Sequence, residues 1–227
     1  MEENICGYIN GYPIYRFIFE PIQSNMYIIV CANEAFIIDP FMDDSIKNFI
    51  EKKEITNAMI ILTHEHYDHI SGVNEFRELC NCIVIAHEYT KKLVESEDNN
   101  LARYYMALFI NKPLQEQVAK ARVINNYTCL VDRTFESRYE LVWENIHFVL
   151  VSTPGHSEGS ICVIMEKQYI FTGDTLVGGA KIITRLPGGS KKRYQEYAKP
   201  FLENLDETMY VFPGHGEPSS IVDFEIL

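Results

Sequence analysis

The sequence predicts a layered α/β fold in which helices cover two packed sheets. Short apolar runs rich in Ile, Val, Phe and Tyr recur along the chain, as is typical of strands. Amphipathic stretches lie between some of these runs, as is typical of helices that pack on a sheet. Both halves of the chain show strands followed by helices, and strands outnumber helices in each half, which favours two sheets with helical outer layers.

The predicted elements follow these patterns in chain order. In the first half, strands are expected at residues 14–19, 26–31, 35–38, 58–62 and 83–86. In the second half they are expected at residues 141–143, 146–151, 161–165, 169–171 and 209–212. Amphipathic helices are expected at residues 43–53, 70–79 and 191–205.

The segment at about residues 90–126 differs from the rest of the chain, because it contains no good strand pattern. It reads as two helices, with Pro113 near the start of the second, where proline is tolerated. The segment is long for a connection, and long connections in compact domains are often functional. We interpret it as a helical insertion that either caps a functional cleft or packs in the core or against a second copy in a homodimer.

Size and charge restrict the class of protein. A chain of 227 residues fits one domain, and we expect residues 1–227 to form it. The net charge of −12 argues against a whole-surface contact with nucleic acid or an anionic membrane. The N-terminus is acidic where a secretion signal is basic, and no apolar run reaches the roughly 18 residues of a membrane span. We therefore expect a cytoplasmic protein with reduced cysteines that acts on a small molecule.

Three of the seven histidines lie within residues 63–69, which read THEHYDH. His64 and His66 follow a predicted strand, and if that strand continues briefly their side chains project to the same side. Asp68 and His69 come next, where a helical pattern begins, and a turn there would aim both toward the same point. We interpret this cluster as metal ligands rather than as a polar loop, because the rest of the chain supplies matching groups.

These matching groups all follow predicted strands. His156 lies in the turn STPGHSEGS, Asp174 directly follows a strand in GDTL, and His215 follows another in PGHG. Strand ends are positions where a rigid scaffold carries chemistry. The remaining histidines, His87 and His147, lie at or within predicted strands. We interpret them as structural, with His87 as an alternative candidate for supporting the metal ligands.

These motifs, in this order, resemble those of the metallo-β-lactamase-fold hydrolases. HEHYDH, TPGH, GDTL and PGHG all match, and SNMYIIV and FIIDP resemble the opening strands of that family. The resemblance covers nearly the whole chain. It implies a four-layer αββα sandwich with the site at one edge of the two sheets. It also implies two divalent metal ions, with His64, His66 and His156 on the first, Asp68, His69 and His215 on the second, and Asp174 bridging both.

The implied metal centre predicts hydrolysis. Imidazole and carboxylate ligands suit zinc best, with iron and manganese as alternatives. Such ions lower the pKa of bound water from 15.7 to about 7, and they stabilise the oxyanion that forms on attack. We therefore expect a dinuclear enzyme that uses a metal-bridging hydroxide. Asp68 is the candidate catalytic residue, which would orient the nucleophile or take part in proton transfer.

Within this family, TPGHSEGS, GDTL and LPGGS are most similar to the hydroxyacylglutathione hydrolase (glyoxalase II) branch, which implies a thioester substrate. Counting from Asp174, however, the usual Arg and Asp of that branch fall on Ile183 and Arg185. Only twelve residues of this sequence follow His215, so we expect no contacts to glutathione of the kind that the C-terminal helical domain of that branch supplies. We expect a small, anionic thioester, lactone or related ester. A mononuclear iron persulfide dioxygenase and a phosphodiesterase are alternatives on the same fold.

Three side chains are candidate substrate contacts. Lys181 and Arg185 belong to a basic stretch at residues 181–199 in which only Glu196 is acidic, and either could bind an anionic group of the substrate. The alternative for this stretch is a solvated helix start. Tyr67 is expected to line the cleft, whereas its neighbour Glu65 is expected to support the structure.

Overall fold

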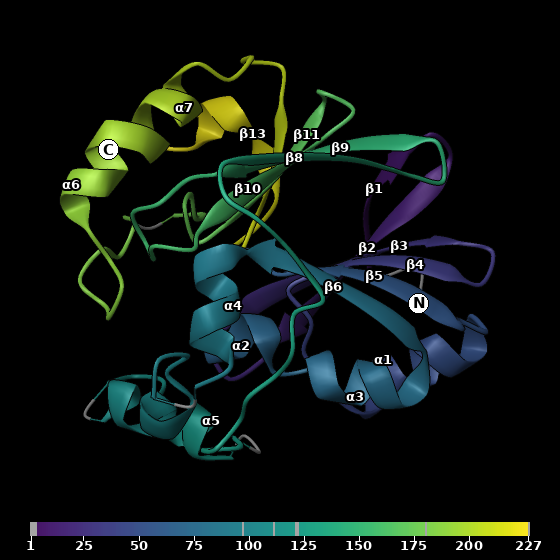
Figure 1. Cartoon of the computed structure of the whole chain (residues 1–227), viewed down its shortest axis with the longest axis horizontal. Helices are drawn as coiled ribbons and strands as arrows, with labels where there is room; N and C mark the ends of the chain where they lie inside the picture. Colours follow the sequence, from purple (N-terminus) through teal and green to yellow (C-terminus); the bar gives the residue numbers. More distant parts are fainter. Residues whose placement is uncertain (1–3, 97, 111, 121–122, 180, 227) are drawn as a thin grey trace.

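The computed structural model describes residues 4–96, 98–110, 112–120, 123–179 and 181–226. In this part of the chain the strands form two sheets that face each other (Figure 1). The first sheet has the order β1 (Ile5–Ile9), β2 (Tyr12–Phe19), β3 (Ser24–Cys31), β4 (Glu34–Ile38), β5 (Asn57–Ile61), β6 (Asn81–His87) and β7 (Arg133–Phe135). The second has the order β13 (Ser219–Ser220), β12 (Tyr210–Pro213), β11 (Tyr169–Gly173), β10 (Ile161–Met165), β9 (Ile146–Ser152) and β8 (Arg138–Trp143).

Helices cover the outer face of each sheet, which confirms the predicted αββα sandwich (Figure 1). α1 (Asp44–Lys52) and α3 (Val73–Leu79) cover the first sheet. α6 (Lys191–Arg193), a π-helical turn at Tyr194–Ala198 and α7 (Lys199–Glu203) cover the second. α1 buries only one face, as the amphipathic pattern predicted, and its buried residues are Ile46, Phe49 and Ile50.

The two sheets share an apolar core that lies between them. Alternate side chains of β3, β4, β9 and β11 point into it, because successive residues of a strand face opposite sides. Phe36 from the first sheet stacks on Phe148 from the second, with ring centroids 4.0 Å apart. Separate apolar clusters lie under the outer helices. The sheets are therefore rigidly packed, and the loops at their edge start from fixed positions.

Strand direction brings the predicted site residues to one edge. β4, β5 and β6 are parallel neighbours, and so are β11 and β12, so the segments that follow these strands leave the sheets at their carboxyl ends. A single bridge between Ser24 and His215 joins the two sheets there. The amide of Asn25 secures it by donating to the carbonyl oxygens of Pro213 and Gly216, at 2.9 and 2.8 Å.

Two local predictions near the histidine cluster were wrong. β5 ends at Ile61, so His64 and His66 lie in a loop and do not extend the strand. The helix predicted at residues 70–79 is two helices, α2 (Tyr67–Ile70) and α3, separated at Gly72. At Gly72 the chain passes so close to Phe41 that a Cβ atom would lie 2.5 Å from its carbonyl carbon. This tertiary contact, which a local pattern does not show, divides the helix.

Three strands were missed by the sequence analysis, namely β1, β7 and β13. Each lies at an outer edge of its sheet and pairs with a single neighbour. β7 has only three residues and β13 only two, so neither is long enough to show an alternating pattern. β1 contains Gly7, which is unfavourable in strands and weakens the signal. Edge strands of this kind form because a neighbouring strand is present.

The insertion predicted at residues 90–126 is helical in its described residues. It contains most of α4 (Glu88–Val94), a 3-10 helix at Ala102–Phe109 and α5 (Gln115–Lys120), which begins two residues after Pro113. Residues 97, 111, 121 and 122 of this segment lie outside the described residues. Among the helices that are described, none combines the length and the apolar character needed to cross a membrane.

Candidate metal centre

Four of the seven predicted ligands come from the first sheet. His64 and His66 lie in the loop that follows β5, and Asp68 and His69 lie in α2, the one-turn helix next to it. The loop is fully buried, and His66 has the extended backbone of the residue that precedes a helix. The turn into α2 brings Asp68 and His69 back toward the histidines, as the sequence analysis expected.

The other three predicted ligands come from the second sheet. His156 lies in the loop between β9 and β10, Asp174 directly follows β11, and His215 follows β12. Close packing of glycines holds these loops together. A Cβ on Gly214 would lie 2.4 Å from the Oδ1 atom of Asp174, so only glycine lets the two loops approach this closely.

The seven side chains form one cluster with two sets of donor atoms. Donor atoms of each set lie within 4.8 Å of one another: His64, His66 and His156 in the first set, and Asp68, His69 and His215 in the second. Asp174 lies between the sets. Its Oδ2 atom is 3.4 Å from Nε2 of His156 and 3.5 Å from Nε2 of His215, and its Oδ1 atom is 3.4 Å from Nε2 of His69. We call these seven residues the donor cluster.

The donor atoms fit a bound cation. The Nε2 atoms of His64 and His66 are buried and have no hydrogen bond to a described residue, and Nε2 of His69 has only the carboxylate oxygens of Asp68 and Asp174 near it, at 3.0 and 3.4 Å. A buried polar atom without a partner costs about 1–3 kcal/mol, so several such atoms directed at one point indicate a missing common partner. Imidazole nitrogens and carboxylate oxygens are ligands of zinc, iron and manganese. The donor cluster therefore suits divalent metal ions, and its chemistry does not select one metal.

Asp39 supports the cluster from behind and was missed by the sequence analysis. Its buried carboxylate accepts hydrogen bonds from the backbone N–H and the hydroxyl of Thr63, at 2.7 and 2.6 Å. It also accepts from Nδ1 of His69 at 3.0 Å, so Nε2 of His69 is directed at the carboxylates of Asp68 and Asp174 within the cluster. Asp39 lies within 4.8 Å of His64 and His69, but these hydrogen bonds occupy its oxygens. Its position after a strand in FIIDP was the available signal.

His156 has a comparable support from the second sheet. Its Nδ1 atom lies 2.7 Å from the backbone carbonyl oxygen of Ile183, to which it donates, so Nε2 faces the donor cluster. Ile183 occupies the position where the hydroxyacylglutathione hydrolase branch usually has an arginine. Any residue at position 183 has a backbone carbonyl oxygen that can accept this hydrogen bond. His156 is therefore oriented by Ile183 even though the side chain is not that of arginine.

The two donor sets differ electrostatically. Burial lowers the pKa of His64 well below its ordinary value and that of His66 to about 3, so both are neutral and ready to bind a metal. Burial also works against a charge on His69 and His215. The carboxylates of Asp68 and Asp174 outweigh it, however, and raise the pKa of both histidines. A metal that binds the second set must therefore displace protons.

Glu65 and Tyr67, which alternate with the ligands, are both buried. The Oε2 atom of Glu65 accepts from the hydroxyl of Ser157 at 2.8 Å, and burial raises the pKa of Glu65 to about 7. The hydroxyl of Tyr67 accepts from the backbone N–H of Ile124 at 2.9 Å, so Tyr67 ties the donor cluster to the insertion. Its ring packs against Tyr105 and Tyr127.

A cavity of about 250 Å³ adjoins the donor cluster. Five members of the cluster line it, and most of the other lining residues are apolar. The insertion contributes one side of this lining, which we call the insertion wall: Leu101, Tyr105, Leu108, Phe109 and Leu114. The apolar surface of this cavity continues beyond the insertion wall over Ile22, Val177, Ile183 and Leu186.

The predicted substrate contacts are placed differently around this cavity. Lys181 lines it and is the only Lys or Arg among its described lining residues. Arg185 is exposed and does not line it, and Tyr67 lies behind Tyr105. The substrate-binding role of Lys181 thus has geometric support, whereas those of Arg185 and Tyr67 stay predictions without it.

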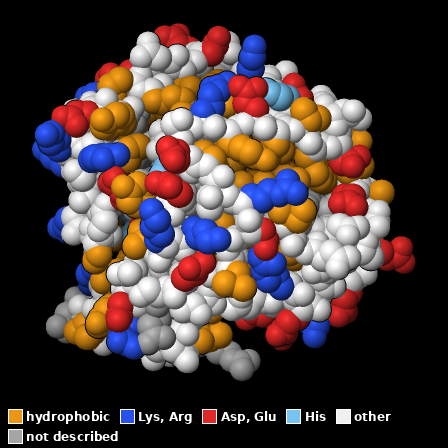
Figure 2. Space-filling view, viewed as in Figure 1, with side chains coloured by type: hydrophobic (Ala, Val, Ile, Leu, Met, Phe, Trp, Pro, Cys, Tyr) orange, Lys and Arg blue, Asp and Glu red, His pale blue; other side chains and the backbone are white. Residues whose placement is uncertain are grey.

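Three of the six basic side chains in the stretch at residues 181–199 form ion pairs, two of them with acids outside the stretch. Arg193 forms an ion pair with Glu158 at 3.0 Å, and Lys199 forms one with Glu203 at 3.7 Å. Lys192 pairs with Glu196 at 3.7 Å. Positive and negative side chains are interspersed over the face in Figure 2. Lys181 is therefore the member of this stretch best placed to attract an anion.

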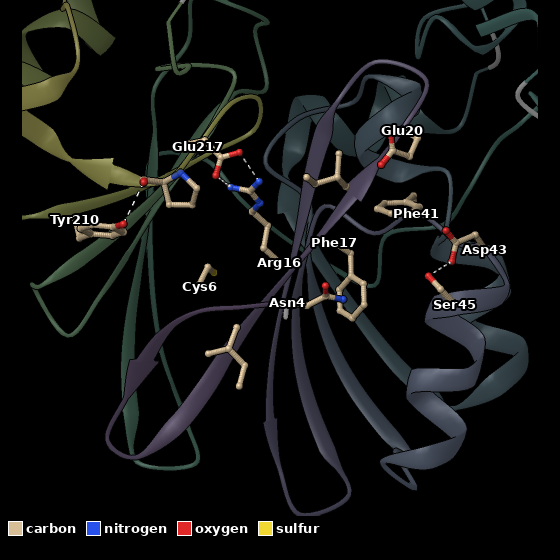
Figure 3. Close-up of a pocket in the computed structure, with 13 residues that line it drawn as sticks. Asn4, Cys6, Arg16, Phe17, Glu20, Phe41, Asp43, Ser45, Tyr210 and Glu217 are labelled. Atoms are coloured by element: carbon tan, nitrogen blue, oxygen red, sulfur yellow. Dashed lines mark hydrogen bonds and ion pairs between the residues drawn. The ribbon is translucent and has the colours of Figure 1, made fainter. Parts of the chain in front are cut away.

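A larger cavity of about 580 Å³ lies on the other side of the His215 loop, and none of the seven donor residues lines it. Figure 3 shows Arg16 in this cavity, directed at Glu217. The two side chains form a double hydrogen bond of 2.5 and 2.6 Å. Glu217 comes two residues after His215, so the pair helps to hold the His215 loop against β2.

Comparisons with known proteins agree with this geometry. The family model described as the metallo-beta-lactamase superfamily matches residues 19–215. A probable metallo-hydrolase, YqgX, of Bacillus subtilis (strain 168) is 28% identical over 204 residues, which cover 89% of each chain. The hydroxyacylglutathione hydrolase of Francisella philomiragia is 26% identical over 218 residues, which cover 92% of this chain and 69% of the relative. The crystal structure of the BLEG-1 B3 metallo-beta-lactamase matches with a TM-score of 0.74 and 25% identity, covering 92% of this chain and 95% of that one.

Proposed function

The chain belongs to the metallo-beta-lactamase superfamily, and we propose that it is a dinuclear metal-dependent hydrolase of small thioesters, lactones or related esters. The observation that carries this proposal is the donor cluster with its two sets of ligand atoms. The first set is buried, and so are Asp68 and His69 of the second, whereas His215 is partly exposed; both sets converge, and Asp174 lies within 3.5 Å of members of each. A centre for a single ion would need only one of these sets, which makes a mononuclear iron dioxygenase the weaker alternative.

Bound divalent ions would lower the pKa of a water molecule from 15.7 to about 7 and polarise the carbonyl group of the substrate. The chain's own residues would fix the geometry of this centre. His69 is oriented by Asp39, and His156 is oriented by the carbonyl oxygen of Ile183. Asp68 is the candidate to orient the attacking water and to accept its proton, because its carboxylate lies within the cluster and also lines the cavity.

The cavity supports a substrate with an apolar acyl group and one anionic group. The insertion wall supplies apolar surface next to the donor cluster, and Lys181 supplies one positive charge. In the reaction, the oxygen of water bonds to the acyl carbon and the bond from that carbon to sulfur or oxygen breaks. The products are a carboxylic acid and a thiol or alcohol. A phosphodiester is less well matched, because arginine clusters typically bind phosphate and no Arg lines the described cavity.

The relatives support the hydrolase class more strongly than any one substrate. The Bacillus relative is named as a probable metallo-hydrolase, and this match covers most of both chains. The hydroxyacylglutathione hydrolase extends beyond the matched region, which covers 69% of its length. A thioester is therefore a reasonable first substrate class, whereas glutathione itself has no separate support in the described cavity.

The test combines metal analysis with a substrate panel. The purified chain is expected to hold close to two metal ions and to hydrolyse thioesters, with kcat/KM rising as the acyl group lengthens from acetyl to hexanoyl. The panel should include lactones, bis-p-nitrophenyl phosphate and, for iron-loaded protein, oxygen uptake with a persulfide. Fewer than one ion per chain, with no activity on adding Zn²⁺ or Mn²⁺, would contradict the proposal. Oxygen uptake without ester hydrolysis would instead favour the dioxygenase.

A further inference from the structure

Tyr105 of the insertion wall has a hydroxyl group that the protein itself leaves unpaired. The side chain is only 2% exposed, and its oxygen has no hydrogen-bond partner among the described residues. An unpaired hydroxyl in a buried position is unfavourable, and native proteins rarely retain one without a reason. Tyr105 also lines the cavity that contains members of the donor cluster. The missing hydrogen-bond partner of the Tyr105 hydroxyl would therefore belong to a molecule bound in that cavity.

The position of Tyr105 is fixed from several sides. Its ring packs against Tyr67 at 5.0 Å and against Phe109 at 5.5 Å, measured between ring centroids. The start of its 3-10 helix is held by Asn100, whose side chain accepts from the N–H of Ala102 at 2.9 Å and donates to the carbonyl oxygen of Tyr127 at 2.8 Å. The hydroxyl is therefore held in place, and a placed donor is more effective than a mobile one.

The hydroxyl remains protonated under ordinary conditions. Burial raises the pKa of Tyr105 well above its usual value, and the carboxylates of Asp68 and Asp174 raise it further. Such a group is a poor acid but a persistent hydrogen-bond donor. It suits an oxygen that gains negative charge during a reaction, and it is poorly suited to transfer its proton to a leaving group.

We propose that Tyr105 is a catalytic residue that touches the substrate, by donating a hydrogen bond from its hydroxyl to the carbonyl oxygen of the acyl group. This inference rests on the proposed ester or thioester hydrolysis. The hydrogen bond strengthens as water attacks the acyl carbon and the carbonyl oxygen becomes an oxyanion. The insertion thus supplies both the apolar surface for the acyl group and one polar contact at the reacting carbonyl.

The first test is Tyr105→Phe, which removes the hydroxyl and keeps the ring. We expect kcat for thioesters to fall about 10²-fold, the lower end of the loss seen when one oxyanion donor is removed, with little change in KM. Metal content should be unchanged. The thermal midpoint should be equal or higher, because an unpaired buried hydroxyl is lost. The matched control is Tyr104→Phe, which changes the adjacent, 50% exposed tyrosine and should leave all of these quantities unchanged.

The leaving group provides a second discrimination. A donor to the carbonyl oxygen should give the same loss for a thioester and an oxygen ester of the same acyl group. A loss confined to the poorer leaving group would overturn the assignment to the carbonyl oxygen. Unchanged kcat in Tyr105→Phe, or a lower thermal midpoint together with lost metal, would show that the hydroxyl has no catalytic contact or a structural one.

A binding experiment separates this inference from the proposed function. The probe is 2-nonanone, a ketone with an apolar chain and no bond to hydrolyse, titrated by calorimetry into the purified wild-type and variant proteins. We expect the wild type to bind it at least threefold more tightly than Tyr105→Phe, and Tyr104→Phe to match the wild type. This expected difference in affinity does not depend on whether any ester in the panel is hydrolysed. Equal affinities, or no binding to the wild type, would overturn the role of Tyr105.

Discussion

The donor cluster and the insertion wall face the same cavity but are built in opposite ways. In the donor cluster, buried polar atoms are held by further hydrogen bonds, such as those from Thr63 and His69 to Asp39. In the insertion wall, apolar side chains pack on one another, and the buried hydroxyl of Tyr105 has no partner among the described residues. The cluster is fixed by directional contacts and the wall by contacts without direction.

This difference indicates how the chain divides its tasks. Directional hydrogen bonds specify one arrangement of ligands, so a change in the donor cluster should abolish the chemistry for every substrate. Apolar packing tolerates changes in side-chain size, so a change in the insertion wall should alter which substrate is preferred. Four substitutions test this division.

The largest effect is expected for Asp174→Asn, because Asp174 lies between the two donor sets. Removing a charge shared by both sets should cost several kcal/mol of transition-state stabilisation, and each 1.36 kcal/mol is tenfold in rate. We expect kcat/KM to fall by at least about 10³-fold for all acyl lengths, with reduced metal content. Kinetics and elemental analysis check this, with the exposed Asp206→Asn as the control. Retained activity would show that Asp174 does not belong to the centre.

A smaller loss is expected for Asp39→Asn, which keeps the shape of the side chain but weakens its hold on Thr63 and His69. Loss of such a supporting partner typically costs 10- to 100-fold in metal affinity or activity. Competition with a metal chelator should show this loss. If only the thermal midpoint fell and metal affinity stayed the same, Asp39 would support the fold rather than the metal site.

Leu108→Ala should change preference rather than chemistry, because Leu108 lines the cavity as part of the insertion wall. Burying one methylene contributes about 0.8 kcal/mol, so removing three carbon atoms, which together contribute about 2.4 kcal/mol, should lower kcat/KM for hexanoyl thioesters about 50-fold. Acetyl thioesters should be hydrolysed as before. Ile110→Ala, at a 58% exposed position two residues away, is the control. An equal loss for both acyl lengths would contradict the division between wall and cluster.

The smallest effect is expected for Glu217→Gln, which weakens the pair with Arg16 beside the His215 loop. The Glu217 side chain is 81% exposed, and exposed pairs contribute about 0–1 kcal/mol. Arg16 lowers the pKa of Glu217, so the pair stabilises the fold above the ordinary Glu pKa and this contribution is lost as pH falls through the lowered value. The difference in thermal midpoint between wild type and variant should be small at pH 7 and should vanish once the pH is below the lowered pKa of Glu217. A difference that grew toward acid pH would contradict this account.

Much of the fold could be predicted because its signals are local. Apolar runs gave ten of the thirteen described strands close to their observed bounds, and one-sided apolar patterns gave the helices that cover them. The exceptions are elements that exist through their neighbours. β7 and β13 form at sheet edges, and the helix at residues 70–79 is divided because the chain at Gly72 passes Phe41.

The candidate site could be predicted as a set of residues but not as an arrangement. The seven donor residues were recognisable because metal binding restricts the residue types and each follows a strand, and the structure brings all seven together. Their role as ligands stays a prediction, as do a homodimer through the insertion and one domain for residues 1–227. Asp39 and Tyr105 were not identified as site residues, because their roles depend on contacts with residues distant in sequence or with a cavity.

The sequence by itself determined the layers, the order of the motifs and the residue types available for metal chemistry. These features follow from strand periodicity and from the identity of single residues, both of which can be read from short segments of the chain. Only the tertiary structure decided which atoms face each other. It placed Asp174 between the two donor sets, Asp39 behind His69, Lys181 in the cavity and Arg185 outside it. These outcomes depend on how two sheets and an insertion pack, and packing is a property of the whole chain.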